Sequence, residues 1–454
     1  MLKSSLAWFR DLYLRIFETE LIRRIVENSS YLVSASGFTA ALGMVQNVYI
    51  ARMLTVAEFG LFGAIKTFTN VLNRFTSFRI NELVVRYVRL FEERGENKKA
   101  AAVFKIAAML EMGGALAAFS LIWVLAPWGA ELFGKDASTA PLWILYGSIV
   151  VVNLLYDSAT GMLHVFNHFR TIAVVTAIQG VALLVMVLVV YYQGFALVGV
   201  LLAYVLGKFI GAVGVMGAAL VVAGRRWGWK WWLTPLRELR EERRSIFNFA
   251  LSTNISSTIS LVAKDSETLW IAAFLGTKQA GYYSFALMLI GLLQLPVSPL
   301  PNTTYPELSR EIARKDWKGA GYVLQRGSLL AAAYSLPVIL VLVAFGQPLI
   351  ELVFKSKYLP AYPALVILLV GYTFVNIFYW NRVALLALNR PVFPTIVNFI
   401  GMLVKVAGIF VLGERYGYIQ FAALLSGYYI FTVGLAAGRA ILDIAHQQSV
   451  DAVA

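Results

Sequence analysis

The sequence contains no cysteine and only three histidines. Without thiols the chain has no disulfides, no thiolate metal ligands and no cysteine nucleophile. The histidines, His164, His168 and His446, are too scattered to supply a zinc cluster. We therefore expect no metal site and no cofactor, and we expect no redox chemistry.

Charged residues are also scarce. They make up 14% of the 454 residues, whereas apolar residues make up 59%; an ordinary soluble domain has about a quarter charged and about half apolar residues. The apolar residues fall in blocks of roughly 20, the length that crosses a hydrocarbon core of about 30 Å as a helix. The net charge of +14 lies largely in short segments beside these blocks, which favours a membrane protein over a nucleic-acid partner.

The blocks predict an all-α polytopic membrane protein with about twelve transmembrane helices in two parallel six-helix pseudo-repeats. A shift of 221 residues lays Gly60 over Gly281 and Gly180 over Gly401, and because six is an even number both halves enter the membrane from the same side. The first six spans are expected at 30–50, 57–80, 103–126, 142–163, 171–192 and 197–222, and the second six at 249–273, 281–300, 327–345, 361–386, 391–412 and 418–438.

These spans divide the chain into five parts. An amphipathic segment on the membrane surface is expected at 1–28, the N-terminal half at 29–222, a connector at 223–248, the C-terminal half at 249–440 and a tail at 441–454. The connector carries four tryptophans, and Thr234 and Pro235 predict the start of a helix there, at the depth of the lipid headgroups.

The distribution of basic residues predicts the orientation. With the N-terminus inside, inner segments hold 27 of the 39 Lys and Arg residues and outer loops hold six. Because basic residues favour the cytoplasmic side, we expect a multi-pass protein of the bacterial cytoplasmic (inner) membrane with both termini cytoplasmic.

Ionisable and polar side chains inside spans indicate a binding site, since they normally face protein or water rather than lipid. Lys66 and Lys264 lie at similar depths and are expected to share a cavity, with Arg74 and Arg382 nearer the cytoplasm. Such a basic cavity suits a pyrophosphate, because Arg offers paired donors and Lys a point charge. The helical spacing adds a polar lining from Asn70, Asn73, Asn254, Ser257 and Ser260.

Each of these assignments has an alternative. Lys264 is also placed to pair with the neighbouring Asp265 or Glu267, and the two arginines are also placed to extend toward the cytoplasmic interface. Lys208 and Lys405, which are lone charges in apolar stretches, are interpreted as packing or interface residues.

Asp265 and then Asp157 are the first candidates to carry a coupling proton or sodium ion, ahead of Glu111 and Glu267. Each of these acids is also suited to act as a structural counter-ion to a nearby Lys or Arg. Pro296 and Pro299 interrupt the inner end of the eighth span, where they predict either a gating hinge or a fixed kink.

Two stretches resemble a known family. Residues 48–68 (VYIARMLTVAEFGLFGAIKTF) and the related 269–286 (LWIAAFLGTKQAGYYSFA), followed by PNTTYPELSRE at 301–311, are similar to polysaccharide flippases of the O-antigen type. These belong to the multidrug, oligosaccharidyl-lipid and polysaccharide exporter superfamily.

The resemblance implies a transporter rather than an enzyme. Its cargo would be a polyprenyl-pyrophosphate-linked oligosaccharide, moved from the cytoplasmic to the outer leaflet by alternating access for cell-surface polysaccharide biosynthesis. Membrane lipids and other polysaccharide assembly proteins would be its partners. The alternative is a cation-coupled multidrug exporter of the same superfamily, whose organic cations a basic cavity would repel. Lipid II flippases typically have two helices beyond twelve, which disfavours that branch.

Overall fold

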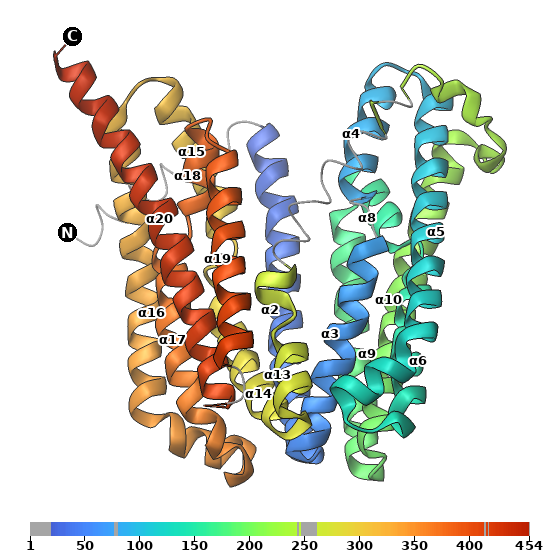
Figure 1. The fold of residues 1–454 in the computed structure, drawn as a ribbon. Coiled ribbons are helices and arrows are strands. Elements are labelled where there is room, and N and C mark those ends of the chain that lie inside the picture. The colour runs from blue at the N-terminus through green and yellow to red at the C-terminus, as the bar shows by residue number, and fades with distance from the viewer. Residues whose placement is uncertain are drawn as a thin grey trace, which may run out of the picture.

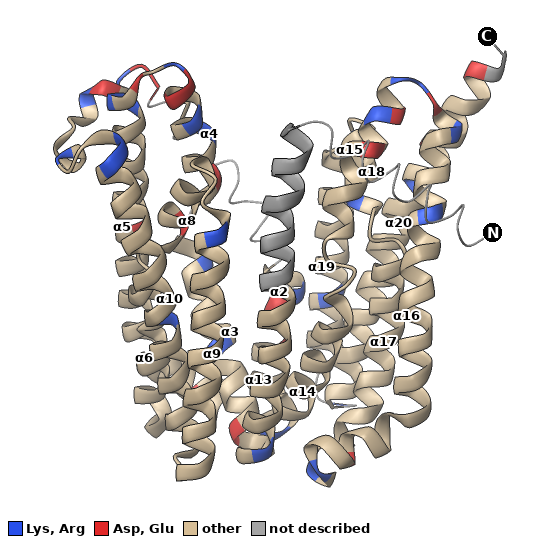
Figure 2. Ribbon diagram, turned by 180° about the vertical axis from the view of Figure 1, so that it is seen from behind, with Lys and Arg blue, Asp and Glu red and all other residues tan. Residues whose placement is uncertain are grey.

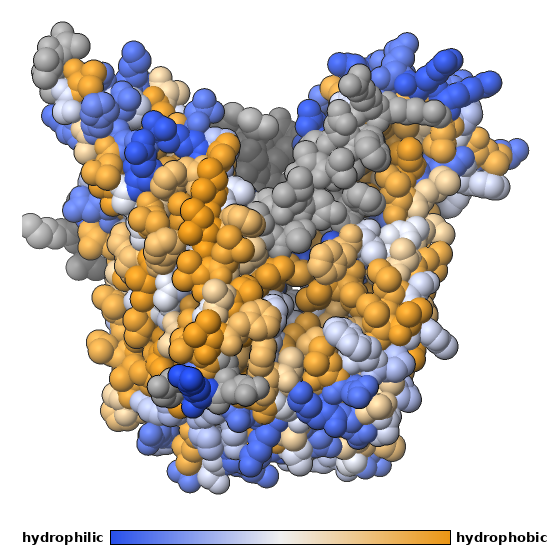
Figure 3. All heavy atoms as spheres, in the orientation of Figure 1, coloured by the Kyte–Doolittle hydropathy of each residue, from blue (hydrophilic) through white to orange (hydrophobic). Residues whose placement is uncertain are grey.

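The computed structural model describes residues 20–76, 80–242, 245–246, 261–412, 415 and 417–453, in which every regular element is a helix. Eight helical stretches in these ranges are long and apolar enough to cross a membrane. Charged residues gather at the two ends of the molecule (Figure 2), and an apolar belt lies between them (Figure 3). The predicted all-α membrane protein is confirmed.

The first helix of the N-terminal half starts at Glu20, ten residues before the predicted start of the first span at residue 30. Between its second and third long helices lies an amphipathic helix that the sequence analysis did not predict and that packs its apolar face against α5 and α8. The elements are α2 (Glu20–Met53), α3 (Val56–Thr76), α4 (Ile80–Glu93), α5 (Asn97–Gly129), α6 (Ala140–Gly147), α7 (Ile149–Val152), α8 (Tyr156–Val165), α9 (Phe169–Gln193) and α10 (Ala196–Trp227).

The C-terminal half follows the same plan, and its last helix continues through most of the predicted tail. Its elements are the π-helical turn η5 (Leu261–Asp265), α13 (Glu267–Leu275), α14 (Thr277–Gln294), α15 (Leu300–Ala313), α16 (Trp317–Phe354), α17 (Tyr362–Ile377), α18 (Asn381–Ala387), α19 (Val392–Leu412) and α20 (Tyr418–Val453). Helices thus occupy all twelve predicted positions within the described residues.

Four of those positions, α2, α3, η5–α13 and α14, are not among the eight apolar stretches. They are helices through which the two halves meet: α3 packs on α14 and α13, and α2 contacts α14. Their small and polar residues therefore face protein or the space between the halves rather than lipid.

The halves touch at one end and diverge toward the other (Figure 1), where the surface is notched between them (Figure 3). At the touching end, Gly60 on α3 faces Gly281 on α14. A Cβ added to Gly60 would lie only 2.5 Å from the Gly281 nitrogen, and one on Gly281 would lie 2.9 Å from the Val56 carbonyl carbon. Two glycines that the repeat relates by sequence therefore let the two halves come into backbone contact.

Reciprocal hydrogen bonds close the same end. The Arg52 guanidinium donates to the Val353 carbonyl at 2.6 Å, and the Lys357 ammonium donates to the Leu54 carbonyl at 2.6 Å. Each cation thus satisfies carbonyls at the C-terminus of a helix from the other half. Burial among these groups lowers the pKa of Lys357.

The connector packs on the N-terminal half. Two short 3-10 helices, η3 (Trp231–Leu233) and η4 (Leu236–Leu239), replace the helix predicted from Thr234. Trp231 packs on Phe104, with ring centroids 5.0 Å apart, and the Lys105 ammonium donates to the Thr234 carbonyl at 3.1 Å. Hydrogen bonds to Glu96 and Glu242 raise the pKa of Lys99. Residues 1–19 of the predicted surface segment lie outside the described residues.

The eighth span ends earlier than predicted. Helix α14 stops at Gln294, and α15 starts at Leu300 after a turn that contains Pro296 and Pro299. Proline has no amide hydrogen and its ring clashes with the preceding turn, so the two prolines disfavour a continuous helix to residue 300. The helix is therefore broken at this point, and a hinge role for the two prolines stays a prediction.

Candidate functional site

The fourth and tenth spans are both broken, at nearly corresponding places in the two repeats. Asn153 lies between α7 and α8 and donates to the Ile149 carbonyl at 3.0 Å, while Asn381 starts α18 and donates to the Phe378 carbonyl at 2.7 Å. Both carbonyls also accept the backbone amide of the same asparagine, so each side chain adds a second hydrogen bond at the break. Each break lines a cavity in its own half.

The cavity in the C-terminal half has a volume of about 220 Å³ and is basic. Lys264 enters it from η5 and Arg382 from α18, and neither forms an ion pair or a hydrogen bond with a described residue. Neutral polar groups from α19 and α20 complete its lining: Thr395, Asn398, Tyr428 and Thr432. The two cations are thus predicted site residues that the structure brings together.

The pairing considered for Lys264 is not found among the described residues. Asp265 instead pairs with Arg74, at 2.6 Å between the guanidinium and the carboxylate, and Glu267 pairs with Lys405. The Arg74–Asp265 pair joins α3 of one half to η5 of the other. Both side chains are partly exposed, and pairs of this kind contribute only about 0.2–1 kcal/mol, so a competing anion can readily displace the carboxylate.

Lys66 and Asn70 lie on the same face of α3, between two points at which α3 touches the other half. Gly63 contacts Ser284, and Arg74 contacts Asp265. Because Lys66 and Asn70 follow at helical spacing between these contacts and are exposed, they face the space between the halves. The Lys66 ammonium lies 5.9 Å from the ring centroid of Tyr204, and Lys66 does not line the cavity of Lys264.

The N-terminal half has a second cavity, of about 180 Å³, which contains Asn73, Asp157 and Lys208. The Glu111 carboxylate accepts hydrogen bonds from the amides of Asp157 at 2.7 Å and Ser158 at 2.9 Å, so it caps the start of α8. Glu111 therefore has a structural role in the helix, while Asp157 remains exposed to the cavity beside Lys208. Lys208, which was interpreted as a packing or interface residue, lines this cavity.

Sequence reasoning overlooked the helix breaks. Asn153, Asn381 and Asn398 are polar residues within apolar spans, and this was a signal that could have identified the cavities. Of the other predicted lining residues, Asn254, Ser257 and Ser260 lie outside the described residues. Lys405, which was interpreted as a packing or interface residue, forms a buried ion pair.

Comparison with known proteins agrees with this architecture. A family model described as "Polysaccharide biosynthesis protein" matches residues 25–312. The chain belongs to this family. The inner membrane protein YghQ of Escherichia coli (strain K12) is 26% identical over 376 residues, which cover 78% of this chain and 97% of YghQ.

Two solved structures have the same fold. The lipid II flippase MurJ in an inward closed conformation has a TM-score of 0.67 and 16% identity, over 91% of this chain and 89% of MurJ. A multidrug resistance MATE family transporter of the MOP superfamily, in an inward-facing conformation, has a TM-score of 0.68 and 14% identity, over 90% of this chain and 96% of the transporter. The chain thus has the fold of this transporter superfamily.

Proposed function

We propose that this protein is a flippase that moves a polyprenyl-pyrophosphate-linked oligosaccharide from the cytoplasmic to the outer leaflet for cell-surface polysaccharide biosynthesis. The observation that carries the proposal is the pair of cations, Lys264 and Arg382, that share one cavity without a carboxylate partner among the described residues. Charges within a membrane protein are costly unless they are paired. A pyrophosphate supplies the missing anion and accepts from both side chains.

The neutral part of the cavity suits the sugar next to the phosphates. The Tyr428 hydroxyl donates to Asn398 Oδ1 at 3.1 Å, which leaves the amide NH₂ group of Asn398 to donate to a sugar hydroxyl. Asn70, on α3 of the other half, faces the space between the halves. The polyprenyl chain would remain in lipid while the headgroup moves between the halves.

The way the halves meet supports transport by alternating access. They are joined through Gly60 and Gly281 at one end and diverge at the end that carries the connector. With the connector in the cytoplasm, as the charge bias predicts, this state loads from the cytoplasmic leaflet. A bound pyrophosphate would compete with Asp265 for Arg74 and so release this ion pair between the halves. Asp265 and Asp157 are the proposed carriers of a coupling proton or sodium ion.

The orientation can be tested with a single introduced thiol, because the natural chain has none. We expect Lys230→Cys, in the connector, to react with a membrane-impermeant maleimide only after spheroplasts are opened. A cysteine at Lys355, in an outer loop, serves as the matched control and should react in intact spheroplasts. Labelling of position 230 from outside would contradict the orientation and the direction of transport.

The function itself is tested in liposomes that contain the purified protein. A fluorescent polyprenyl-pyrophosphate glycan and an organic-cation dye are followed in parallel. We expect transfer of the glycan lipid between leaflets without dye uptake. Dye uptake alone would instead support the multidrug exporter, although an organic cation would be repelled by Lys264 and Arg382, which have no ion-pair partner among the described residues.

A further inference from the structure

The turn that carries Lys264 and Asp265 is π-helical, and side chains hold its carbonyls. The Ser266 amide donates at 3.0 Å to the Leu261 carbonyl, five residues back, and so bypasses the Val262 carbonyl that an α-helix would use. The Val262 carbonyl accepts instead from the Ser266 hydroxyl at 3.1 Å. The next carbonyl, that of Ala263, accepts from the ammonium of Lys405.

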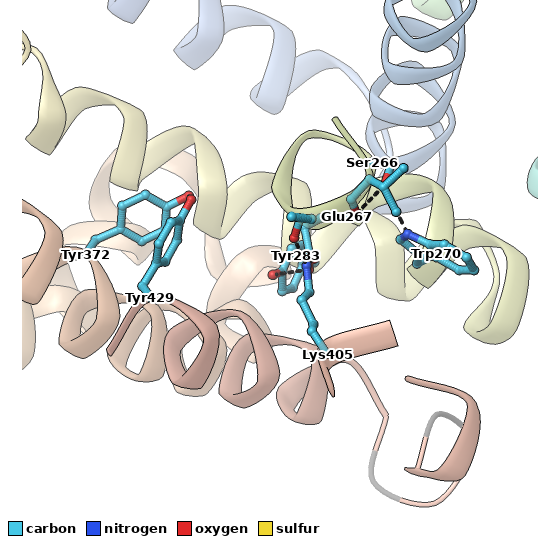
Figure 4. A network of polar contacts seen from close by, with 9 residues as sticks. Ser266, Glu267, Trp270, Tyr283, Tyr372, Lys405 and Tyr429 are labelled. Carbon is cyan, nitrogen blue, oxygen red and sulfur yellow. Dashed lines mark hydrogen bonds and ion pairs between the residues drawn. The ribbon is translucent and has the colours of Figure 1, made fainter. Parts of the chain in front are cut away.

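Lys405 reaches this turn from α19. It forms an ion pair with Glu267, and the two side chains are only 2% and 1% exposed. The Tyr283 hydroxyl, from α14, donates to the same carboxylate at 2.8 Å (Figure 4). One buried ammonium therefore binds both Ala263 and Glu267, the residues on either side of the segment that contains Lys264 and Asp265.

Stability alone does not account for this arrangement. Removing two charges from water costs about as much as their attraction returns, and apolar replacements of buried pairs are often neutral or stabilising. The pair does, however, fix the geometry of the turn. Relaxing η5 to an ordinary α-helical turn shifts the helical register by one residue, which rotates the neighbouring side chains by about 100°. Lys264 would then no longer enter the cavity while Asp265 pairs with Arg74.

We propose that Lys405 is a positioning residue: paired with Glu267, it holds the π-helical turn that directs Lys264 into the cavity and Asp265 toward Arg74. Lys405 lies outside the lining of that cavity, so it acts through the turn and does not contact the cargo. The effect on transport rests on the proposed function, whereas the effect on the turn does not.

The test compares the parent with the double variant Lys405→Met/Glu267→Leu, in which apolar side chains replace the pair. Cysteines added at Arg74 and Asp265 in both backgrounds, and joined by a short bismaleimide, report on the turn. A control pair, Gly63→Cys with Ser284→Cys, reports on the α3–α14 contact. A Cβ at Gly63 lies 3.4 Å from the Ser284 Cβ, close to the spacing of a disulfide.

We expect the 63–284 disulfide to form equally in both backgrounds and the 74–265 cross-link to fall several-fold in the double variant. Without the added cysteines, the double variant should transfer glycan lipid roughly 10- to 100-fold more slowly, as misplaced binding groups do. Glu267→Gln, which keeps the size of the side chain, should also lower the yield of the 74–265 cross-link.

If the 74–265 cross-link formed with the same yield in the double variant as in the parent, the proposal would be overturned. Loss of the 63–284 disulfide would also overturn it, because the pair would then support the whole interface rather than the turn. If the cross-link falls but the parent itself moves no glycan lipid, the positioning role stands and the proposed function fails.

Discussion

Gly281→Val is expected to prevent the two halves from closing at the end where they touch and to abolish transport. A Cβ at this position would overlap the Val56 carbonyl group on α3, and both partners are helix backbone, which cannot move aside as a side chain can. Overpacking of a tight contact typically costs about 1–3 kcal/mol, and a clash between two backbones should reach the upper end of this range. The measurements are the thermal midpoint in detergent and glycan-lipid transfer in liposomes.

Helix α14, which carries Gly281, offers a matched control, since a Cβ at Gly291 would meet nothing within 4 Å. Gly291→Val makes the same change in helix propensity, so it isolates the effect of the contact. We expect its midpoint and its transport rate to stay near those of the parent. Gly60→Val should match Gly281→Val because the two glycines oppose one another. If Gly281→Val and Gly291→Val behaved alike, the contact would not govern closure.

Much of the fold could be predicted because membrane spans are encoded locally. Apolar length, basic loops and the 221-residue repeat placed the helices and related Gly60 to Gly281. That these two glycines touch was not predicted. Related residues of two repeats meet only if they lie near the axis between the repeats, and the position of that axis depends on how the halves pack.

The partners of the charged residues were the part that the sequence did not determine. Lys264, Asp265 and Glu267 lie within four positions of the chain, yet only Asp265 and Glu267 have ion-pair partners among the described residues, one from each half. The π-helical turn changes which way each side chain points, and no residue pattern distinguishes such a turn from an ordinary helix. Lys66 and Lys264 were expected to share a cavity, but Lys66 does not line the cavity of Lys264.

Lys264→Ala and Arg382→Ala are each expected to raise the glycan-lipid concentration needed for half-maximal transfer, and together to remove measurable transport. Losing one hydrogen bond to a charged group costs about 1.5–3 kcal/mol, which corresponds to roughly 10- to 150-fold in affinity. Lys66→Ala should have a smaller effect, because Lys66 faces the space between the halves but lies outside the cavity. Transfer is measured in liposomes over a range of lipid concentrations.

The control for this series is Arg415→Ala, which removes one positive charge from an exposed position in the turn between α19 and α20. It lowers the net charge by the same amount as the cavity variants, so it separates binding within the cavity from attraction by the whole protein. We expect its half-maximal concentration to stay at the parent value. If Lys264→Ala and Arg382→Ala also stayed there while remaining folded, the pyrophosphate would bind elsewhere, and the basic cavity would lose its assignment as the site of the cargo.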